Sequence, residues 1–309
     1  MSAPERHFLI EPPAPFRLDL TVWALRRRAH NEIDRWDGHV YQRALSLGEG
    51  AAAFELVDEG ELDAPRLAVT LAGDRVDGRA EAEARAAVAK VLGLGVDLSG
   101  FAAMAAADSS LNGLAAHMRG LKPPRFPTVF EGLVNGIACQ QLSLTVGVHL
   151  LNRLTAAYGP VATALSEGLH AFPGPTELAD VDPIELKALG FSLAKARTIV
   201  ASARAILGGD LDLEGLEGEE DGAVLERLTS LHGVGRWTAQ YVMLRGLGRL
   251  HIFPGDDVGA RNKLEAFLGL EESLDYEGVE SVVSRWAPFG GLVYFHLLLD
   301  SLARSGLVQ

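Results

Sequence analysis

The stretch LHGVGRWTAQYVMLRGLG, residues 231–248, decides how the second half of the chain is interpreted. Its glycines Gly233 and Gly235 separate two helical patterns, VLERLTSL before them and RWTAQYVMLRGL after them. Glycine adopts backbone angles that are closed to other residues, and it leaves no side chain over the turn. The N–H groups of the turn and of the next helix can therefore point outward together, where the helix dipole favours an anion. The stretch predicts a helix, a tight turn and a second helix, with an anion site at the turn.

The anion that suits such a turn best is a nucleic-acid phosphate, which is held without regard to base sequence. We expect the contacts to nucleic acid to come from Gly233, Val234, Gly235, Arg236 and Thr238, with help from Arg245 or Lys263. The turn carbonyls of Thr229, Leu231 and Val234 could hold a monovalent cation that bridges to the same phosphate. The alternative is a plain connection between two helices, in which the glycines serve only the geometry of the turn.

Two further features follow this turn along the chain. Trp237 and Tyr241 are four residues apart, so on a helix they share a face. After that helix comes HIFPGDD, in which Asp256 and Asp257 begin another helical pattern. One carboxylate at this place serves as a helix N-cap. Two acidic residues exceed what one cap needs, so we expect one of them to face a cleft.

The composition describes an ordinary globular chain. Its 309 residues suggest about two domains, with 48% hydrophobic and 22% charged residues. No apolar run reaches the roughly 18 residues of a membrane span, and the first residues lack the pattern of a signal peptide. The single cysteine, Cys139, excludes a disulfide framework, a four-cysteine zinc site and a four-cysteine iron–sulfur cluster. We expect a reduced, cytoplasmic protein with no membrane partner.

The net charge of −13 argues mildly against a nucleic-acid partner, but its distribution weakens that argument. Residues 210–226 hold eight acidic and no basic residues. The rest of residues 111–309 is nearly neutral, with 16 basic and 15 acidic residues. Because binding depends on the local field, a basic face remains compatible with this sequence.

The N-terminal part predicts an α+β domain with a small antiparallel sheet. Residues 16–23 and 66–73 alternate apolar and polar side chains as half-buried strands do. Residues 42–50 and 52–60 resemble a strand pair around a glycine turn, and residues 80–93 have helical spacing.

The remainder is helical almost throughout, with Gly, Pro and Asp at the joints. The expected helices are 98–106, 109–119, 127–140, 143–158, 176–180, 183–190, 193–207, 221–230, 235–247, 257–268, 275–284 and 288–304. The chain is therefore predicted to be mainly α-helical, with an N-terminal α+β domain.

The combination of motifs resembles the helix-hairpin-helix DNA glycosylases, and is most similar to the bacterial 3-methyladenine DNA glycosylase II type. Beside the opening stretch, the resemblance is carried by PPRFPTVFEGLVNGIACQQLS (123–143), LKALGFSLAKARTIVASA (186–203), FPGDDVGARN (253–262) and RWAPFGGLVYFHLL (285–298). It spans residues 120–300 in order. Residues 1–100 resemble, more weakly, the sheet domain that precedes the catalytic lobes in longer members.

The resemblance implies an arrangement of domains as well as an activity. We expect an N-terminal domain over residues 1–100 and a helical glycosylase domain over 101–309. Its two lobes, 124–247 with the hairpin and 101–123 plus 248–309, would flank a DNA-binding cleft. No cofactor is implied, and we expect a monomer that binds double-stranded DNA with alkylated bases.

Residue by residue, Asp257 matches the catalytic aspartate of these enzymes. Members that also nick the strand have a lysine after GVGR, where this chain has Trp237, so the resemblance implies a monofunctional enzyme. Relatives often have an aromatic residue after the aspartate, and Val258 here implies a roomier pocket.

Breaking the bond to a buried base requires the nucleotide to be turned out of the duplex. A fixed carboxylate can then stabilise the positive charge that develops on the sugar and orient water. Cationic 3-methyladenine or 7-methylguanine suits an electron-rich aromatic pocket. We expect its walls to be Trp237 and Tyr241, with Trp286 or Phe289 added, although core packing is the slightly favoured account of each of the last two. Gln141 and Leu142 match the side chains that fill the gap in the duplex.

Two other functions remain open on the sequence. The first is a glycosylase of the same fold for another lesion, such as hypoxanthine, ethenoadenine or an oxidised base. The second is a helix-hairpin-helix module that binds DNA without catalysis, in which Asp257 is only a helix cap.

Overall fold

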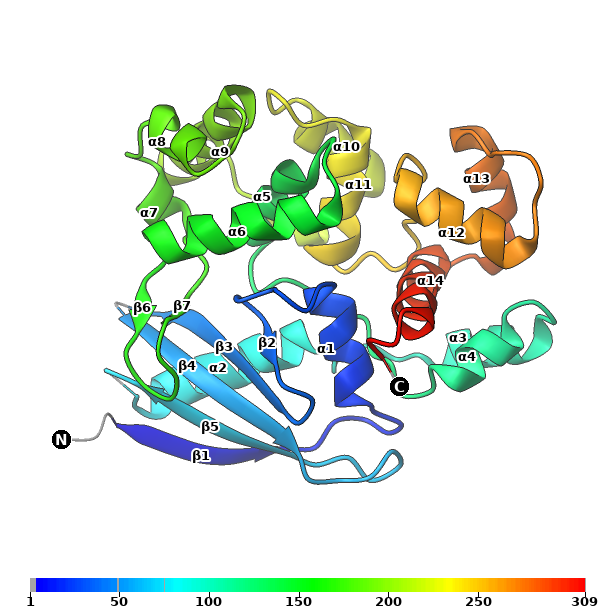
Figure 1. Cartoon of the computed structure of the whole chain (residues 1–309), viewed down its shortest axis with the longest axis horizontal. Helices are drawn as coiled ribbons and strands as arrows, with labels where there is room; N and C mark the ends of the chain where they lie inside the picture. The colour runs from blue at the N-terminus through cyan, green and yellow to red at the C-terminus, as the bar shows by residue number, and fades with distance from the viewer. Residues whose placement is uncertain (1–3, 49, 75, 309) are drawn as a thin grey trace.

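An antiparallel sheet organises the N-terminal part of the molecule. The computed structural model describes residues 4–48, 50–74 and 76–308. The strands lie in the order β1-β5-β4-β3-β2, and one face of the sheet is covered by helix α2 (Gly78–Val91) (Figure 1). Their bounds are β1 Glu5–Ile10, β2 Arg35–Trp36, β3 Val40–Leu47, β4 Gly50–Asp58 and β5 Leu67–Gly73.

The strand pair around a glycine turn, the strand over 66–73 and the helix over 80–93 are confirmed. In the pair, β3 and β4 are antiparallel with Leu47 opposite Gly50, and residue 49 of the predicted turn lies outside the described residues. The sequence interpretation missed β1, which pairs with β5 at the edge of the sheet.

The strand predicted over residues 16–23 is wrong, because helix α1 (Leu18–Arg26) occupies this stretch. Leu18, Val22 and Leu25 pack into the core of the sheet domain. Leu20, Trp23 and Ala24 pack into a different core, beside α14. The two sets have the spacings of three and four residues that place side chains on one side of a helix. A helix that buries two sides has apolar residues on both of them, and here these residues produce the alternation of apolar and polar side chains that a strand also shows.

All twelve helices expected from residue 98 onward are present, with ends that differ by at most three residues. They are α3 Ser99–Ala107, α4 Asn112–His117, α5 Val129–Cys139, α6 Leu144–Tyr158, α7 Pro175–Leu178, α8 Pro183–Ala188, α9 Leu193–Leu207, α10 Asp221–Thr229, α11 Arg236–Arg245, α12 Val258–Leu268, α13 Tyr276–Val283 and α14 Gly290–Arg304. A two-stranded pair, β6 (Val161–Ala162) and β7 (Leu169–His170), was not predicted.

Two hydrophobic cores divide the helical part. The first is built almost entirely from residues 129–247. The second joins residues 101–121 and 244–308 with side chains of α1. In Figure 1 the elements of the first core lie above the sheet, and α12, α13 and α14 stand beside them with α3 and α4 below. Among the described residues, no single helix is long and apolar enough to cross a membrane. Only the bent pair of α13 and α14 meets that criterion together, by length and composition.

A buried ionic cluster fastens the sheet to the first helical core. Arg43 on β3 donates to Asp34 at 2.5 Å and to both oxygens of Glu131 on α5 at 2.5 and 2.6 Å. Tyr41 donates a further hydrogen bond to Asp34 at 2.8 Å. All three charged side chains are almost fully buried. Removing one member of such a cluster leaves uncompensated charge away from water, which is strongly destabilising.

We therefore expect Arg43→Met to lower the free energy of unfolding by about 3–5 kcal/mol, because Asp34 and Glu131 lose their cation. Urea denaturation measures the change. Arg79→Met is the control, since Arg79 is 82% exposed and pairs with Glu83 on the surface of α2. Equal midpoints for the two variants would show that the buried cluster does not hold the sheet to α5.

Candidate active site

The predicted helix, turn and helix are formed by α10, residues 230–235 and α11. Gly233 has a φ of +82°, and a Cβ on it would lie 2.5 Å from the hydroxyl oxygen of Thr198. That hydroxyl donates to the carbonyl of His232 and fixes the turn from α9. Only glycine fits this position, because both the backbone angle and the contact exclude a side chain.

The turn presents unpaired backbone donors, as an anion site requires. Within the part of the chain that the structure describes, the N–H groups of Gly233, Gly235 and Arg236 donate to no other group. Val234 is a correction to the expected DNA contacts: its N–H bonds to the carbonyl of Leu231 at 3.0 Å, and its side chain is buried.

The carbonyl groups suggested for a monovalent cation differ in their hydrogen bonding. Leu231 accepts from Val234, whereas the carbonyls of Thr229 and Val234 accept no hydrogen bond from the described residues. Two of the three are therefore free to act as ligands, and the cation remains a prediction.

Two arginines near the turn are held by the protein itself. Arg236 forms a two-pronged ion pair with Asp256, at 2.7 and 3.0 Å, and its guanidinium lies 3.6 Å from the ring centre of Tyr276. Asp256 is thus occupied by Arg236. Arg245, which ends α11, is fully buried and cannot reach a phosphate on the surface.

Asp257 is the N-cap of α12 and also lines two hollows of the surface. Its Oδ1 accepts the N–H of Ala260 at 2.9 Å, while Oδ2 accepts no hydrogen bond from a described residue. One hollow is a pocket of about 330 Å³ that also contains Trp237, Tyr241 and Tyr294. The other is an open groove beside the turn and residues 140–143. The sequence analysis assigned the helix cap and the cleft-facing carboxylate to two different acidic residues. In the structure Asp257 has both roles.

Trp237 and Tyr241 meet in the 330 Å³ pocket. Their rings are stacked, with centres 5.6 Å apart and planes inclined by 30°. Trp237 is half-buried and Tyr241 fully buried. The Tyr241 hydroxyl accepts from Arg27 at 2.8 Å and donates to Asn135 at 3.1 Å. The stack thus forms a rigid apolar wall within the same pocket as Asp257.

Two predicted pocket walls are corrected, because the structure does not bring Trp286 and Phe289 to this pocket. Trp286 is fully buried in the second helical core, and its indole N–H donates to Asp108 at 2.9 Å. Phe289 packs edge-on against Phe101, with ring centres 5.8 Å apart. Both residues therefore pack in the second helical core, as the alternative interpretation expected.

Thr238 is also corrected as a DNA contact. Its side chain is buried, and its hydroxyl accepts from the Gln140 amide at 2.9 Å. The same amide donates to the carbonyl of Gly233. Gln140 therefore connects the α5–α6 loop to the turn, and it leaves the next two residues free at the loop tip. Gln141 is exposed with a φ of +53°, and Leu142 is 43% exposed.

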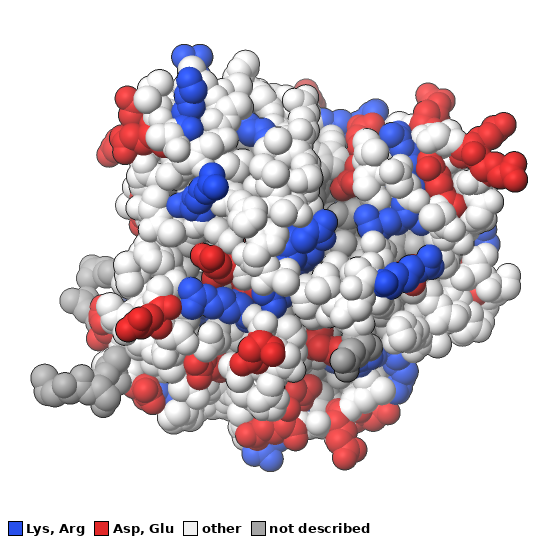
Figure 2. Space-filling model, in the orientation of Figure 1, with Lys and Arg blue, Asp and Glu red and all other residues white. Residues whose placement is uncertain are grey.

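Basic and acidic side chains gather in different parts of the face shown in Figure 2. In Figure 2, basic side chains cross the middle of the face around α6, α12 and α14, whereas acidic side chains gather mainly below, over the sheet, and near α13. The negative net charge of the chain is therefore not spread evenly over this face.

The geometry agrees with comparisons to known proteins. Residues 134–288, half of the chain, match the model of the HhH-GPD superfamily of base excision DNA repair proteins. The chain belongs to the HhH-GPD superfamily.

Individual relatives agree with this assignment. The DNA-3-methyladenine glycosylase of Bacillus subtilis is 27% identical over 65% of this chain and 66% of its own length. DNA-3-methyladenine glycosylase 2 of Escherichia coli is 30% identical over 62% and 64%. Matches to the first curated relatives span 55% to 66% of their length. The resemblance to the 3-methyladenine type is thereby confirmed.

Solved structures extend the similarity to the whole fold. The 3-methyladenine DNA-glycosylase from Archaeoglobus fulgidus has a TM-score of 0.83 and 25% identity, and the match covers 96% of this chain and 98% of that one. The Schizosaccharomyces pombe 3-methyladenine DNA glycosylase, solved in complex with abasic DNA, has a TM-score of 0.55 and 26% identity over 64% and 94%.

Sequence reasoning missed several residues of this HhH-GPD pocket. Arg27, Arg28, Lys263 and Tyr294 line it together with Asp257. The run RRR at residues 26–28 was a visible signal, but it directly follows the stretch that was interpreted as a strand. Its position at the end of a helix that packs between two cores could not be recognised once that helix was missed.

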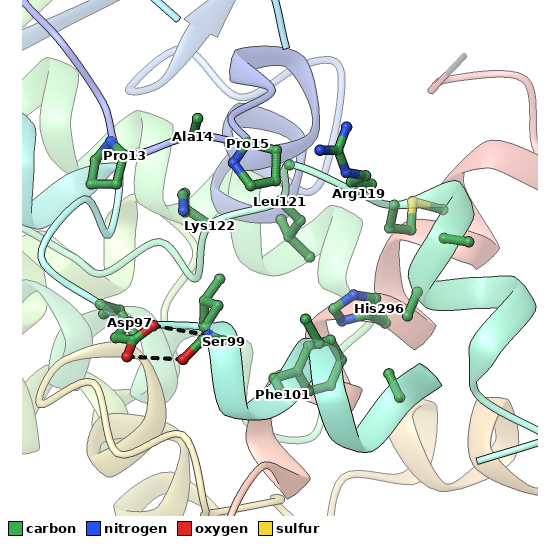
Figure 3. Close-up of a pocket in the computed structure, with 18 of the residues that line it drawn as sticks. Pro13, Ala14, Pro15, Asp97, Ser99, Phe101, Arg119, Leu121, Lys122 and His296 are labelled. Carbon is green, nitrogen blue, oxygen red and sulfur yellow. Dashed lines mark hydrogen bonds between the residues drawn. The ribbon is translucent and has the colours of Figure 1, made fainter. Parts of the chain in front are cut away.

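A second and larger cavity, of about 710 Å³, lies away from Asp257. Its walls come from residues 13–15, α3, α4 and α14, and Figure 3 shows Phe101 and His296 on one side of it with Pro13 and Pro15 opposite. His296 is fully buried, and its Nδ1 donates to the carbonyl of Leu292 at 2.8 Å. Burial lowers the pKa of His296 from 6.5 to about 4, against the opposing effect of that hydrogen bond.

We expect Gly235→Asp to weaken binding to duplex DNA roughly tenfold at low salt, because its carboxylate would lie where a phosphate binds. A Cβ at Gly235 meets no atom within 4 Å, and aspartate is a favoured N-cap, so the fold should persist. Fluorescence anisotropy with labelled duplex at two salt concentrations measures the effect. Gly235→Asn, which caps without charge, is the control, and equal affinities of the two variants would remove the anion site.

Neutral His296 makes stability depend on pH. Below pH 6.5 the unfolded chain binds a proton at this residue, whereas the folded chain does not until about pH 4. Stability is therefore lost as the pH falls from 6.5 towards 4, by up to about 1.4 kcal/mol per pH unit. Urea denaturation at pH 7 and pH 5 should show this loss in the wild type and a smaller loss in His296→Gln. The same loss in both proteins would contradict the assignment to His296.

Proposed function

We propose that this protein is a monofunctional DNA glycosylase that hydrolyses the bond between a damaged purine and its deoxyribose in double-stranded DNA. The observation that carries the proposal is the pocket that holds Asp257 and the Trp237–Tyr241 stack together, next to the unpaired N–H groups of the turn. Membership of the superfamily and the names of the relatives support it.

DNA would be positioned by the turn and the α5–α6 loop. Gly233, Gly235 and the start of α11 offer backbone donors to a phosphate. Gln141 and Leu142, at the exposed loop tip, are placed to enter the gap that the extruded nucleotide leaves in the duplex. The extruded base then occupies the 330 Å³ pocket, which shares Asp257 and Trp237 with the groove.

The reaction divides between the base and the carboxylate. As the C1′–N9 bond breaks, its electron pair moves to the base and positive charge develops on the sugar. Asp257 stabilises this charge and orients the water that attacks C1′, and the proton of that water passes to the carboxylate or to solvent. The positive end of α12 and the hydrogen bond from Ala260 fix the carboxylate for both tasks.

N-alkylated purines, such as 3-methyladenine and 7-methylguanine, are the proposed substrates. They carry positive charge in DNA, so they leave as neutral bases and need little assistance. An aromatic face attracts such a cation by about 0.5–2 kcal/mol, and Trp237 offers this face. Val258 lines the groove rather than the pocket, so the expectation that a valine here widens the pocket is corrected.

The absence of a lysine at position 237 supports the monofunctional reaction, in which water rather than an amine attacks the sugar. Lys263 is a lysine that lines the pocket, and its Nζ donates to the carbonyl of Gly259 at 3.0 Å. It is the amine to test if the strand is cut.

We expect the wild type, without added metal, to release 3-methyladenine and 7-methylguanine from methylated duplex DNA and to leave the strand intact until alkali is added. Asp257→Asn should release them at least about 100-fold more slowly, because a neutral amide does not stabilise the charged sugar. Chromatography of the freed bases and gel electrophoresis of the strand measure both results.

Asp275→Asn is the matched control, because Asp275 caps α13 through the N–H of Gly278 just as Asp257 caps α12. It loses the same kind of cap at a distance from the pocket, and it should keep base release. If Asp257→Asn released bases as fast as the control does, Asp257 would be only a cap and the module would bind DNA without catalysis. Strand cutting before alkali, with a protein–DNA adduct trapped by borohydride and lost in Lys263→Met, would overturn the monofunctional assignment.

A further inference from the structure

Two buried arginines lie against the ring of Tyr241, the inner wall of the pocket. The guanidinium carbon of Arg27 is 5.8 Å from the ring centre, and that of Arg245 is 5.7 Å from it. Arg27 comes from the end of α1, where it has a φ of +59°, and it lines the pocket directly. Arg245 lies behind Tyr241, among Phe126 and Phe295.

Neither guanidinium forms an ion pair with a carboxylate in the described part of the chain. Arg27 donates to the Tyr241 hydroxyl at 2.8 Å and to the Asn135 amide oxygen at 2.6 Å. Arg245 donates to the carbonyls of Ala24 and Leu25 at 2.7 and 3.3 Å. Both Nε atoms, and Nη1 of Arg245, are buried without a partner.

This arrangement contrasts with Arg43, which is buried to the same degree and contacts two carboxylates. Arginine stays protonated inside proteins, so both charges persist. The carbonyl end of α1 offers only about half a negative charge near Arg245. The floor of the pocket therefore holds an excess of positive charge in a region of low dielectric, where its field is strong.

Resting on the proposed function, we propose that Arg27, backed by Arg245, stabilises the negative charge that a neutral lesion base acquires as it leaves the sugar. When such a base departs, the electron pair of the C1′–N9 bond stays on the purine, which leaves as an anion and later takes a proton from water. A fixed positive charge beside the pocket is complementary to that anion and not to the neutral base before cleavage, so it lowers the barrier.

Asp257 and Arg27 then act on opposite partners of the same bond. The carboxylate stabilises the sugar cation, and the guanidinium stabilises the departing base. A cationic base such as 7-methylguanine is repelled by Arg27 when it binds and loses that repulsion as it leaves as a neutral molecule, so relative to free DNA its transition state gains no stabilisation from Arg27. The proposal thus separates two classes of substrate by their dependence on one residue.

The test compares kcat/KM for release of hypoxanthine, a neutral base, with kcat/KM for release of 7-methylguanine from otherwise identical duplexes, measured with enzyme in excess but below the dissociation constant. Asn135→Asp is the decisive variant, because it keeps the shape of the side chain and places a carboxylate against Nη2 of Arg27. Arg27→Met removes the charge, Arg27→Lys keeps it, and Arg79→Met removes an exposed charge on α2 as the control. Thermal unfolding shows which variants are folded.

We expect Asn135→Asp and Arg27→Met to slow hypoxanthine release by about 100-fold, while 7-methylguanine release changes little. Arg27→Lys should recover much of the loss, and the control should match the wild type. Equal slowing of both bases in Asn135→Asp would show that Arg27 only supports the fold of the pocket. A wild type that releases 7-methylguanine but no hypoxanthine would also overturn the inference, whereas release of neither base would overturn the proposed function instead.

Discussion

The hydroxyl of Tyr241 connects the three parts of the chain that form the pocket. This hydroxyl belongs to α11, accepts a hydrogen bond from Arg27 at the end of α1, and donates one to Asn135 on α5. One atom therefore joins the N-terminal part of the chain to α5 and α11. A buried hydroxyl needs its hydrogen bonds, because losing one leaves a polar atom unpaired away from water. Because these hydrogen bonds fix the ring of Tyr241, they also fix the place where Trp237 stacks on it. The sheet domain is therefore a structural part of the pocket, because its first helix supplies Arg27.

The helical half of the fold was predictable because its signals are local. Proline, glycine and aspartate mark the joints, and Thr128, Ser143, Asp182, Ser192, Asp257 and Asp275 cap the helices that follow them. Helix α1 was not predictable by the same means. Its neighbours come mainly from strands β3–β5 and α2 on one side and from α14 on the other, and a window of eight residues cannot reveal that it is buried on both sides. The error had a functional consequence, since Arg26, Arg27 and Arg28 end this helix.

The candidate site shows the same limit in its aromatic residues. Trp237 and Tyr241 lie four apart on a helix next to the turn, so their shared face followed from sequence. Trp286 and Phe289 also lie in a stretch that resembles the family. The orientation of their side chains, however, depends on distant partners: Asp108 for Trp286 and Phe101 for Phe289. Thr238 and Arg245 failed for a related reason. A position on α11 near the glycine turn is not exposed when α5 packs against that helix, as it does here.

The two aspartates show how a carboxylate can cap a helix and still keep an oxygen free for the proposed chemistry. A cap bond is often an argument against catalysis, because it accounts for the carboxylate without any ligand. In this structure the bond from Ala260 occupies only Oδ1, and it holds the side chain at the mouth of the pocket. Asp256 cannot take that role, because Arg236 holds both of its oxygens. The ion pair thereby distinguishes the neighbouring carboxylates. Asp256 fixes the start of α11 to the loop before α12, and Asp257 keeps one oxygen without a hydrogen bond from the described residues. An acid pair at a helix start is thus best interpreted by asking which oxygen atoms remain free.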